Sequence, residues 1–183
     1  AMDFSGDIRL EDKPLTAYAS KERARKVAWV PQHLIPFSHL TTREFVLTGR
    51  FPYLGFLGSY SSHDHEVCLG FLEQLALLDF ADRALNTLSG GELQRATLAR
   101  AQETPILLLD EPDQSLDPPA REDLFQRLEG LSQSGKTLIC TTHHMEALSY
   151  PHARILGIRA GELVWDHPGG ESFTALKSAV YGS

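Results

Sequence analysis

Short apolar runs along this chain predict strands, and longer apolar stripes at helical spacing predict helices. Val27 to Val30 is a candidate for a short buried strand, which Pro31 closes. Ile106 to Leu109 is an unbroken apolar run and predicts a second buried strand. Thr137 to Thr141 is rich in residues that favour strands and predicts a third.

The two ends of the chain carry shorter patterns. Asp7 to Leu10 alternates as a short strand does, and Asp12 to Pro14 is typical of a turn. Arg154 to Trp165 predicts a closing hairpin, with Ala160 and Gly161 in its turn. Ser172 to Tyr181 predicts a short helix at the end.

Helices are predicted on both sides of the first of these buried strands. Lys21 to Lys26 is typical of a solvated helical face. Thr41 with Glu44 downstream resembles a capping box, so we expect a helix to start there and run towards Gly49. Asp64 to Phe80 predicts an amphipathic core helix. Its apolar stripe consists of Val67, Phe71, Leu72, Leu75 and Leu78.

Two stretches in this region allow more than one interpretation. Phe51 to Tyr60 mixes aromatic residues with glycine and proline, which predicts a loop or a set of irregular turns. Its aromatic residues fit either a surface that docks a partner or ordinary core packing. His63 to His65 invites a metal interpretation, but a metal site needs three or four converging ligands and no second pair has ligand spacing. We therefore interpret it as a polar helix start.

The stretch Leu88 to Arg95 has the chemistry of a phosphate site. Ser89 is a good N-cap, and Gly90 and Gly91 let backbone N–H groups approach a ligand. A helix-forming run follows at once, Glu92 to Arg100. Exposed amides and the positive dipole end of a capped helix attract anions, most often phosphate.

Two adjacent acids, Asp110 and Glu111, come directly after the apolar run at Ile106 to Leu109, and Pro112 follows them. In an open α/β sheet the carboxyl ends of the strands are where ligands bind. A carboxylate at that edge can hold hydrated Mg²⁺, and a second one can accept a proton from an attacking water. Together with the phosphate site, this indicates nucleotide chemistry.

Five motifs in order resemble those of the ABC-type ATPases. Leu88 to Arg95 resembles their signature motif, and Leu107 to Pro112 resembles the end of their Walker B strand. Three further motifs match the Q-loop glutamine, the D-loop and the switch-histidine loop, in this order. These are Gln32, Ser115-Leu116-Asp117 and Thr141-Thr142-His143.

The resemblance covers nearly the whole chain and implies an α/β fold of the P-loop NTPase-like class. It implies a core sheet flanked by helices within a single domain, residues 1–183, and an α-helical signature subdomain at about 33–100. The family's P-loop and first strands lie upstream of the strand that Gly6 to Leu10 resembles. We therefore expect them to be absent and the domain to be N-terminally incomplete. We also expect this chain alone to bind ATP weakly or not at all, and therefore to be inactive in ATP hydrolysis.

One string inside the chain, Gly130 to Thr137, does match the P-loop pattern G-x-x-x-x-G-K-[ST]. A working P-loop follows a strand and opens a helix, because the helix N-terminus holds the phosphates. Here the predicted order is reversed, since a helix running from Asp117 to about Leu128 precedes the string and the strand at Thr137 follows it. We therefore interpret Gly130 and Gly135 as turn residues.

The resemblance implies a role for each matching residue, with ATP and Mg²⁺ as cofactors. Glu111 would be the catalytic base, with Gln32 and His143 as sensors of the terminal phosphate. Asp110 would hold Mg²⁺ through water, with Gln32 reaching the same ion. His144 departs from the aspartate common in the family at that position. The implied nucleotide-binding residues are Ser89, Gly90, Gly91, Glu92 and Asp117.

Composition narrows the class of protein further. The net charge is −7, which argues against a nucleic-acid surface. Cys68 and Cys140 lie far apart without metal-like spacing, which indicates a reduced, cytosolic compartment. No apolar run approaches the roughly 18 residues of a membrane span. We therefore expect a soluble protein, and the resemblance to the ABC-type ATPases implies that the permease holds it at the inner face of the cell membrane.

The resemblance also implies partners: a second ABC ATPase domain in a head-to-tail dimer, and the transmembrane permease. Gly49 to Tyr53 and the ending Val180 to Gly182 look most like importers of iron–siderophore, haem or cobalamin. Phosphonate-type and other small-solute importers are close competitors. Two other classes stay open: a degenerate, non-hydrolysing module that lends its signature to a partner, and a soluble ABC protein of DNA repair or translation.

Overall fold

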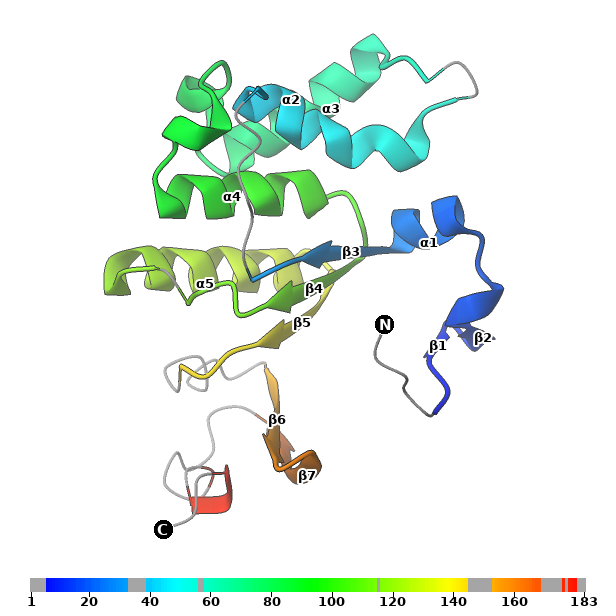
Figure 1. Ribbon diagram of the computed structural model, residues 1–183, viewed down its shortest axis with the longest axis vertical. Helices are drawn as coiled ribbons and strands as arrows, with labels where there is room; N and C mark the ends of the chain where they lie inside the picture. Colours follow the sequence, from blue (N-terminus) through cyan, green and yellow to red (C-terminus); the bar gives the residue numbers. More distant parts are fainter. Residues whose placement is uncertain are drawn as a thin grey trace. The chain divides into compact units, whose positions relative to one another are not determined.

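The computed structural model describes residues 6–32, 39–55, 58–114, 116–144, 153–168, 176 and 178–180 (Figure 1). The chain divides into two compact units, Ala1–Thr141 and Thr142–Ser183. The first holds a central sheet and the long helices, and the second holds a hairpin.

The central sheet has three parallel strands, β3 (Val27–Val30), β4 (Ile106–Asp110) and β5 (Thr137–Thr141), with β4 in the middle. This confirms the three predicted strands. The register pairs Val30 with Leu109, so the carboxyl ends of the strands meet at one edge. The residues that follow each strand are therefore brought close together.

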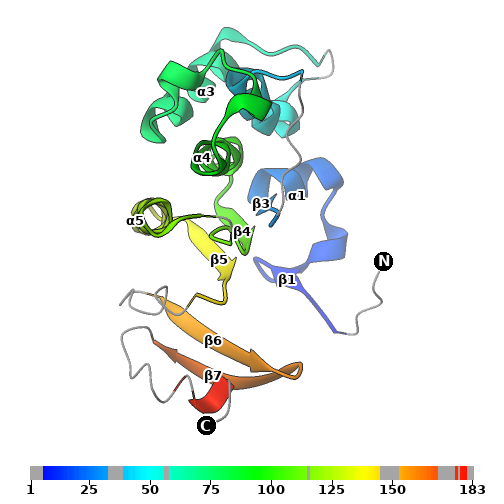
Figure 2. The same ribbon diagram turned by 60° about the vertical axis from the view of Figure 1, so that its left-hand side comes forward.

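One face of this sheet is packed and the other is open in the described part of the chain. Leu107 and Leu109 point to the packed face and are almost fully buried. Figure 2 shows α4 (Gly90–Ala101) and α5 (Pro118–Gln133) on the same side of the strands. On the other face, Trp29 and Ile139 are 61% and 57% exposed. The expectation that β3 would be buried therefore holds for Val30 and is wrong for Trp29.

The helical part between β3 and β4 begins with α2 (Thr42–Leu47), which starts at the predicted capping box of Thr41 and Glu44. A 3₁₀ helix, η2 (Thr48–Tyr53), follows, and then α3 (Ser62–Gln74). The remaining elements of the first unit are β1 (Arg9–Leu10), β2 (Lys13–Pro14), η1 (Leu15–Ala17), α1 (Ser20–Lys26), η3 (Leu78–Phe80) and η4 (Leu85–Thr87).

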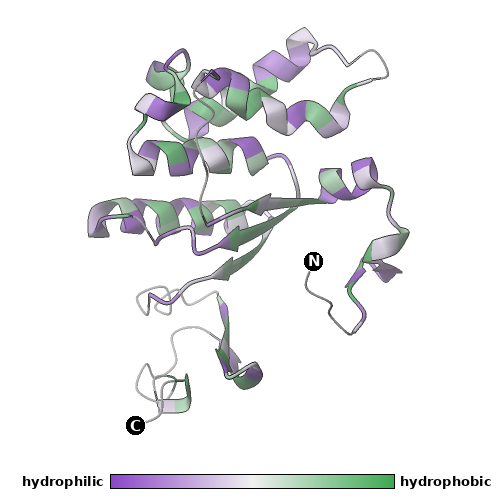
Figure 3. Ribbon diagram, viewed as in Figure 1, coloured by the Kyte–Doolittle hydropathy of each residue, from purple (hydrophilic) through white to green (hydrophobic). Residues whose placement is uncertain are grey.

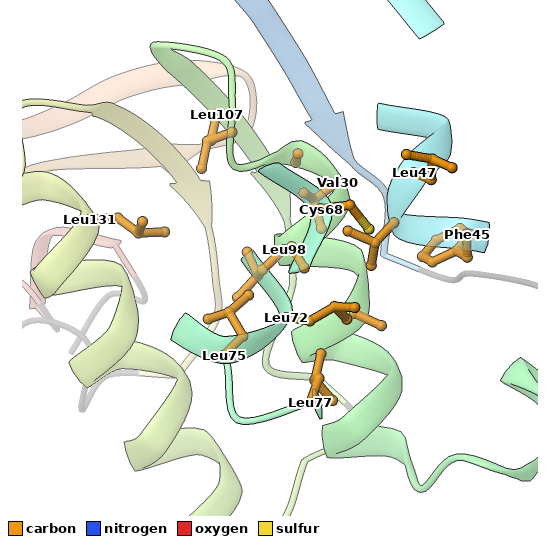
Figure 4. Packing of buried hydrophobic residues seen from close by; sticks show 14 of the residues in the cluster. Val30, Phe45, Leu47, Cys68, Leu72, Leu75, Leu77, Leu98, Leu107 and Leu131 are labelled. Atoms are coloured by element: carbon orange, nitrogen blue, oxygen red, sulfur yellow. The ribbon is translucent and has the colours of Figure 1, made fainter. Parts of the chain in front are cut away.

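The core joins the helical part to the sheet. Figure 4 shows Phe45, Leu72 and Leu98 packed together with Val30, and each is at most 1% exposed. Figure 3 shows why: the central strands are mostly hydrophobic, while the long helices alternate hydrophobic and hydrophilic stripes. Burial of an apolar side chain of this size stabilises the fold by about 1.5–3 kcal/mol.

One prediction in the helical part is wrong. The helix expected through Phe80 ends at Gln74, because Ala76 takes a left-handed φ of 52° and the chain turns there. Leu78 then lies in a 3₁₀ turn and is 45% exposed. The stretch expected to be a loop or irregular turns, Phe51 to Tyr60, begins with the 3₁₀ turns of η2, which continue directly from α2 as far as Tyr53.

Two predicted boundaries also move. At the start of the chain the turn falls at Glu11 and Asp12, whose φ angles are 49° and 61°, and the residues after it pair as β2. At its other end, α5 continues beyond Leu128 as far as Gln133, with Leu131 buried on the same face. Both shifts are a few residues long.

The second unit contains the predicted hairpin. β6 (Arg154–Arg159) and β7 (Glu162–Pro168) pair antiparallel, and Ala160 and Gly161 make the turn with φ angles of 52° and 83°. The predicted final helix, 172–181, is helical at residue 176 and at 178–180, and its other residues lie outside the described ranges. Among the described residues, no helix is both long enough and apolar enough to span a membrane.

Candidate nucleotide site

Asp110 and Glu111 are fixed at the end of β4 by one residue of the neighbouring strand, Thr141. The Thr141 hydroxyl donates to Oδ1 of Asp110 at 2.8 Å and accepts from the backbone N–H of Glu111 at 3.0 Å. The same N–H lies 3.1 Å from the Thr141 carbonyl oxygen. Glu111 takes a left-handed φ of 41°, a conformation that residues other than glycine rarely adopt and that is often found at functional sites.

Gln32, two residues after the end of β3, meets Glu111 at this edge. Its Nε2 donates to Oε2 of Glu111 and to Oε1 of Gln114, both at 2.8 Å. Both N–H groups of the amide are therefore used, and its oxygen is left as an acceptor. The structure thus brings Gln32, Asp110 and Glu111 together, as the resemblance to the ABC-type ATPases implies.

The start of α4 is a complete capping box. Ser89 Oγ accepts from the backbone N–H of Glu92 at 3.3 Å, and the Glu92 carboxylate accepts from the Ser89 N–H at 2.6 Å. This second bond lowers the pKa of Glu92. The N–H groups of Gly90 and Gly91 belong to the first turn, where helices leave donors without intrahelical partners. Ser89 and Gly90 are exposed, so an anion can approach.

The start of α5 lies beside the start of α4. A Cβ placed on Gly91 would be 3.7 Å from Cβ of Ala120. Asp117 caps α5, since its Oδ1 accepts from the Ala120 N–H at 2.9 Å, and prolines occupy the first positions of the helix. Ser115, the first residue of the predicted D-loop, lies outside the described residues.

His143 belongs to the second unit. Its ring lies 4.4 Å from the ring of His144, centroid to centroid, and the His144 backbone N–H donates to the Thr142 hydroxyl at 3.0 Å. The histidine pair follows β5 along the chain by two residues.

The edge of the sheet where Asp110 and Glu111 lie suits Mg²⁺ better than a metal ion whose ligands all come from protein side chains. The described residues contain no group of three or more His, Cys, Asp or Glu side chains that could hold a metal ion. Mg²⁺ is commonly bound by one or two carboxylates, water and substrate phosphates. The strand-end carboxylate of Asp110 uses one oxygen for Thr141, so it suits this shared kind of binding.

The string that matches a P-loop has a structural role instead. Gly130 lies inside α5, so its interpretation as a turn residue is wrong, whereas Gly135 makes the turn after the helix with a φ of 93°. Lys136 Nζ donates to the carbonyl oxygen of Thr104 at 3.1 Å, and burial lowers its pKa. The string begins in the last turn of α5 and ends at the first residue of β5, so the order of elements is the reverse of that around a P-loop, as the sequence predicts.

Sequence reasoning assigned no role to Thr141 by itself and missed Gln114. The register pairs Asp110 with Thr141 across β4 and β5. A hydroxyl residue at the end of the neighbouring strand could have indicated the first contact. Gln114 sits in an irregular turn, and no pattern of the sequence points to it.

The comparisons with known proteins identify the family. A family model described as ABC transporter matches residues 2–114. The phosphonates import ATP-binding protein PhnC of Staphylococcus epidermidis is 34% identical over 187 residues, covering 97% of this chain and 73% of that protein. The ferric enterobactin transport ATP-binding protein FepC of Escherichia coli is 32% identical over 181 residues, covering 97% of this chain and 67% of that protein.

Solved structures give the same result. The ATP-binding cassette MJ0796, a dimer in a post-hydrolysis state with ADP and Pi, matches with a TM-score of 0.75 and 27% identity, over 90% of this chain and 73% of that one. A metal-chelate type ABC transporter in an inward-facing conformation matches with a TM-score of 0.76 and 25% identity, over 85% of this chain and 63% of that one. The chain therefore belongs to the ATP-binding domains of ABC transporters and has the α/β fold of an ABC ATPase cassette.

Proposed function

We propose that this chain belongs to the ATP-hydrolysing subunit of an ABC importer. The observation that carries the proposal is the pairing of Gln32 with Glu111, 2.8 Å apart, beside Asp110 at the edge of the sheet. The capped start of α4, where Ser89 and Gly90 are exposed, would supply the phosphate contact. Carboxylates, an amide and a phosphate-binding helix are the parts that phosphoryl transfer to water needs.

In this proposal each group has one task. Glu111 orients the attacking water and accepts its proton, and Gln32 holds the Glu111 carboxylate in place. Asp110 would hold Mg²⁺ through water, and the ion would supply charge stabilisation at the phosphates. His143 would contact the terminal phosphate. Catalysis would then consist mostly of positioning and charge stabilisation.

The phosphate contact would be made between two copies. Ser89, Gly90 and Gly91 of one copy would face the terminal phosphate of ATP held by the other, with Glu92 keeping the capping box closed and Asp117 linking the two sites. The dimeric cassette MJ0796, bound to ADP and Pi, supports this arrangement. Residues 1–183 would act as one ABC ATPase domain, with 33–100 as its helical subdomain.

We propose a transmembrane permease as the second partner, with the ATPase at the inner face of the membrane. For the cargo we favour a metal chelate, because Gly49 to Tyr53 resembles that importer class and FepC is a ferric enterobactin transport protein. PhnC, a phosphonates import protein, supports the competing assignment. Stimulation of ATP hydrolysis by a ferric siderophore, and not by a phosphonate, in vesicles with the permease would decide between them.

The test of the proposed site is ATP-dependent association of the full-length protein. Glu111→Gln removes the base, so Mg²⁺-ATP should convert this variant from monomer to dimer in light scattering. Adding Ser89→Asp keeps a capping oxygen but places a negative charge at the phosphate, and it should abolish the association. Association that does not need ATP, or that survives Ser89→Asp, would contradict the proposal.

A further inference from the structure

Arg50 is a charged side chain buried within the first unit, at 8% exposure. Its Nε donates to Oδ1 of Asp64 at 2.7 Å, and its Nη1 donates to Oε1 of Glu103. Its guanidinium also lies 4.5 Å from the centroid of the Tyr53 ring. A buried charge is costly unless it is well paired. Asp64, Glu103 and the Tyr53 ring supply this pairing for the Arg50 guanidinium.

Glu103 links the Arg50 guanidinium to the segment between α4 and β4. It lies in the short connector, 102–105, between the end of α4 and the start of β4. Its neighbours Gln102 and Thr104 are both buried, at 5% and 6% exposure. Side chains from three other parts of the chain form hydrogen bonds with the connector. They are those of Arg50 in η2, Gln74 in α3 and Lys136 just before β5.

The connector joins the two halves of the proposed site. At the far end of α4 lies Ser89, and at the far end of β4 lies Asp110. With its 12 residues, α4 is about 18 Å long, so a tilt of about 5° at the connector would move its start by about 1.5 Å. A misplacement of about 1 Å can cost on the order of 100-fold in rate.

The backbone next to Arg50 packs directly on the end of α4. A Cβ placed on Gly49 would lie 2.1 Å from the carbonyl oxygen of Arg100, so only glycine fits this approach without movement. The contact holds η2 against the last turn of α4. Arg50 therefore reaches Glu103 from a fixed base.

Glu103 depends on this contact. Its other oxygen, Oε2, is buried and has no hydrogen-bond partner in the described part of the chain. Arginine suits the task better than lysine, because its planar fork reaches two carboxylates at once. A lysine at position 50 would keep the charge and lose one of the two contacts.

We infer that Arg50 is a positioning residue of the ATPase reaction, which braces the connector at Glu103 and so fixes α4 relative to the carboxylates that follow β4. The inference rests on the proposed function, since the proposed reaction needs both halves of the site in register. Arg50 itself touches none of Asp110, Glu111 or Ser89 in the contacts described above.

The test compares kcat and KM for Mg²⁺-ATP in variants of the full-length protein, at a temperature where circular dichroism shows each to be folded. Arg50→Lys should lower kcat about 10- to 100-fold while KM stays within about twofold. Glu103→Gln, which keeps the shape of the side chain, should act in the same direction. The control Arg43→Gln removes an exposed ion pair with Asp82 from α2 and should leave both constants within about twofold.

Unchanged kcat in both Arg50→Lys and Glu103→Gln would overturn the inference and leave Arg50 a stability residue only. A raised KM at unchanged kcat would overturn it too, because it would indicate lost binding of ATP and not lost positioning. Failure of the proposed function is seen separately, in the wild-type protein, as hydrolysis that is absent or does not depend on Glu111. That result would remove the inference as well.

Discussion

At the scale of single residues, one Thr141 hydroxyl donates to the Asp110 carboxylate and accepts from the Glu111 backbone N–H. Thr141→Val has nearly the same shape and removes that hydroxyl, so the Asp110 carboxylate and the Glu111 backbone lose a shared anchor. We expect kcat for ATP hydrolysis to fall about tenfold, since removing one positioning hydrogen bond loosens the site without removing its groups. Thr141→Ser should restore most of the rate. Equal rates in wild type and Thr141→Val would show that the hydroxyl is not needed.

Asp64 predicts a pH dependence of folding stability. Hydrogen bonds from Ser61 and Arg50 hold the pKa of this carboxyl well below its usual range. A carboxyl whose pKa is lower in the folded state stabilises the fold above its unfolded pKa of about 3.9, and this contribution is lost as the pH falls. Asp64→Asn should therefore lower the urea midpoint at pH 7 by more than it does at pH 3.

The quantity compared is the difference in urea midpoint between wild type and Asp64→Asn at each pH. A difference that is smaller at pH 3 than at pH 7 supports the pairing of Asp64 with Arg50 and Ser61. A difference of the same size at both pH values would mean that the charge of Asp64 contributes nothing to folding stability.

At the scale of elements, the contact between η2 and α4 depends on Gly49. Gly49→Ala would force a methyl group against the Arg100 carbonyl, and neighbouring backbone would have to move. We expect the free energy of unfolding to fall by about 1–3 kcal/mol or more. Gly70→Ala is the matched control: it lies inside α3 with open space around it, and it should stabilise by about 1 kcal/mol. Chemical denaturation measures both, and similar values for the two would contradict this packing.

Sequence patterns predict where these elements start better than where they end. Thr41 and Ser89 start helices because a side-chain oxygen caps a backbone N–H, and that chemistry is local. The end of α3 is not determined by the local sequence, because the apolar pattern continues as far as Leu78. In the structure Ala76 takes a left-handed φ, and Leu77 is buried in the core instead of Leu78. Only tertiary packing decides between these two outcomes.

For the site, too, some contacts can be predicted from the sequence and others cannot. The resemblance of their motifs to those of the ABC-type ATPases implies that Gln32 and Glu111 come together, although they lie 79 residues apart. The partners at that edge, Thr141 and Gln114, depend on register and on an irregular turn, which periodicity does not reveal.

At the scale of the whole molecule, substitution of Lys136 tests whether the string Gly130 to Thr137 binds phosphate. Lys136→Met removes its hydrogen bond to the Thr104 carbonyl and keeps much of the apolar stem. We expect the free energy of unfolding to fall by about 1–2 kcal/mol, and the Kd of the full-length protein for Mg²⁺-ATP to stay within about threefold of wild type. Denaturation and calorimetry measure the two effects. Loss of ATP binding without loss of stability would make the string at Gly130 a phosphate loop after all.

The central claim is that Glu111 is the base of an ABC ATPase, and steady-state ATP hydrolysis tests it most directly. The full-length protein would be compared with Glu111→Gln and with Glu122→Gln, which removes an exposed carboxylate from α5. We predict that Glu111→Gln loses on the order of 100- to 10,000-fold in kcat while still binding Mg²⁺-ATP, and that Glu122→Gln keeps the wild-type rate. Hydrolysis by Glu111→Gln at the wild-type rate would contradict the account.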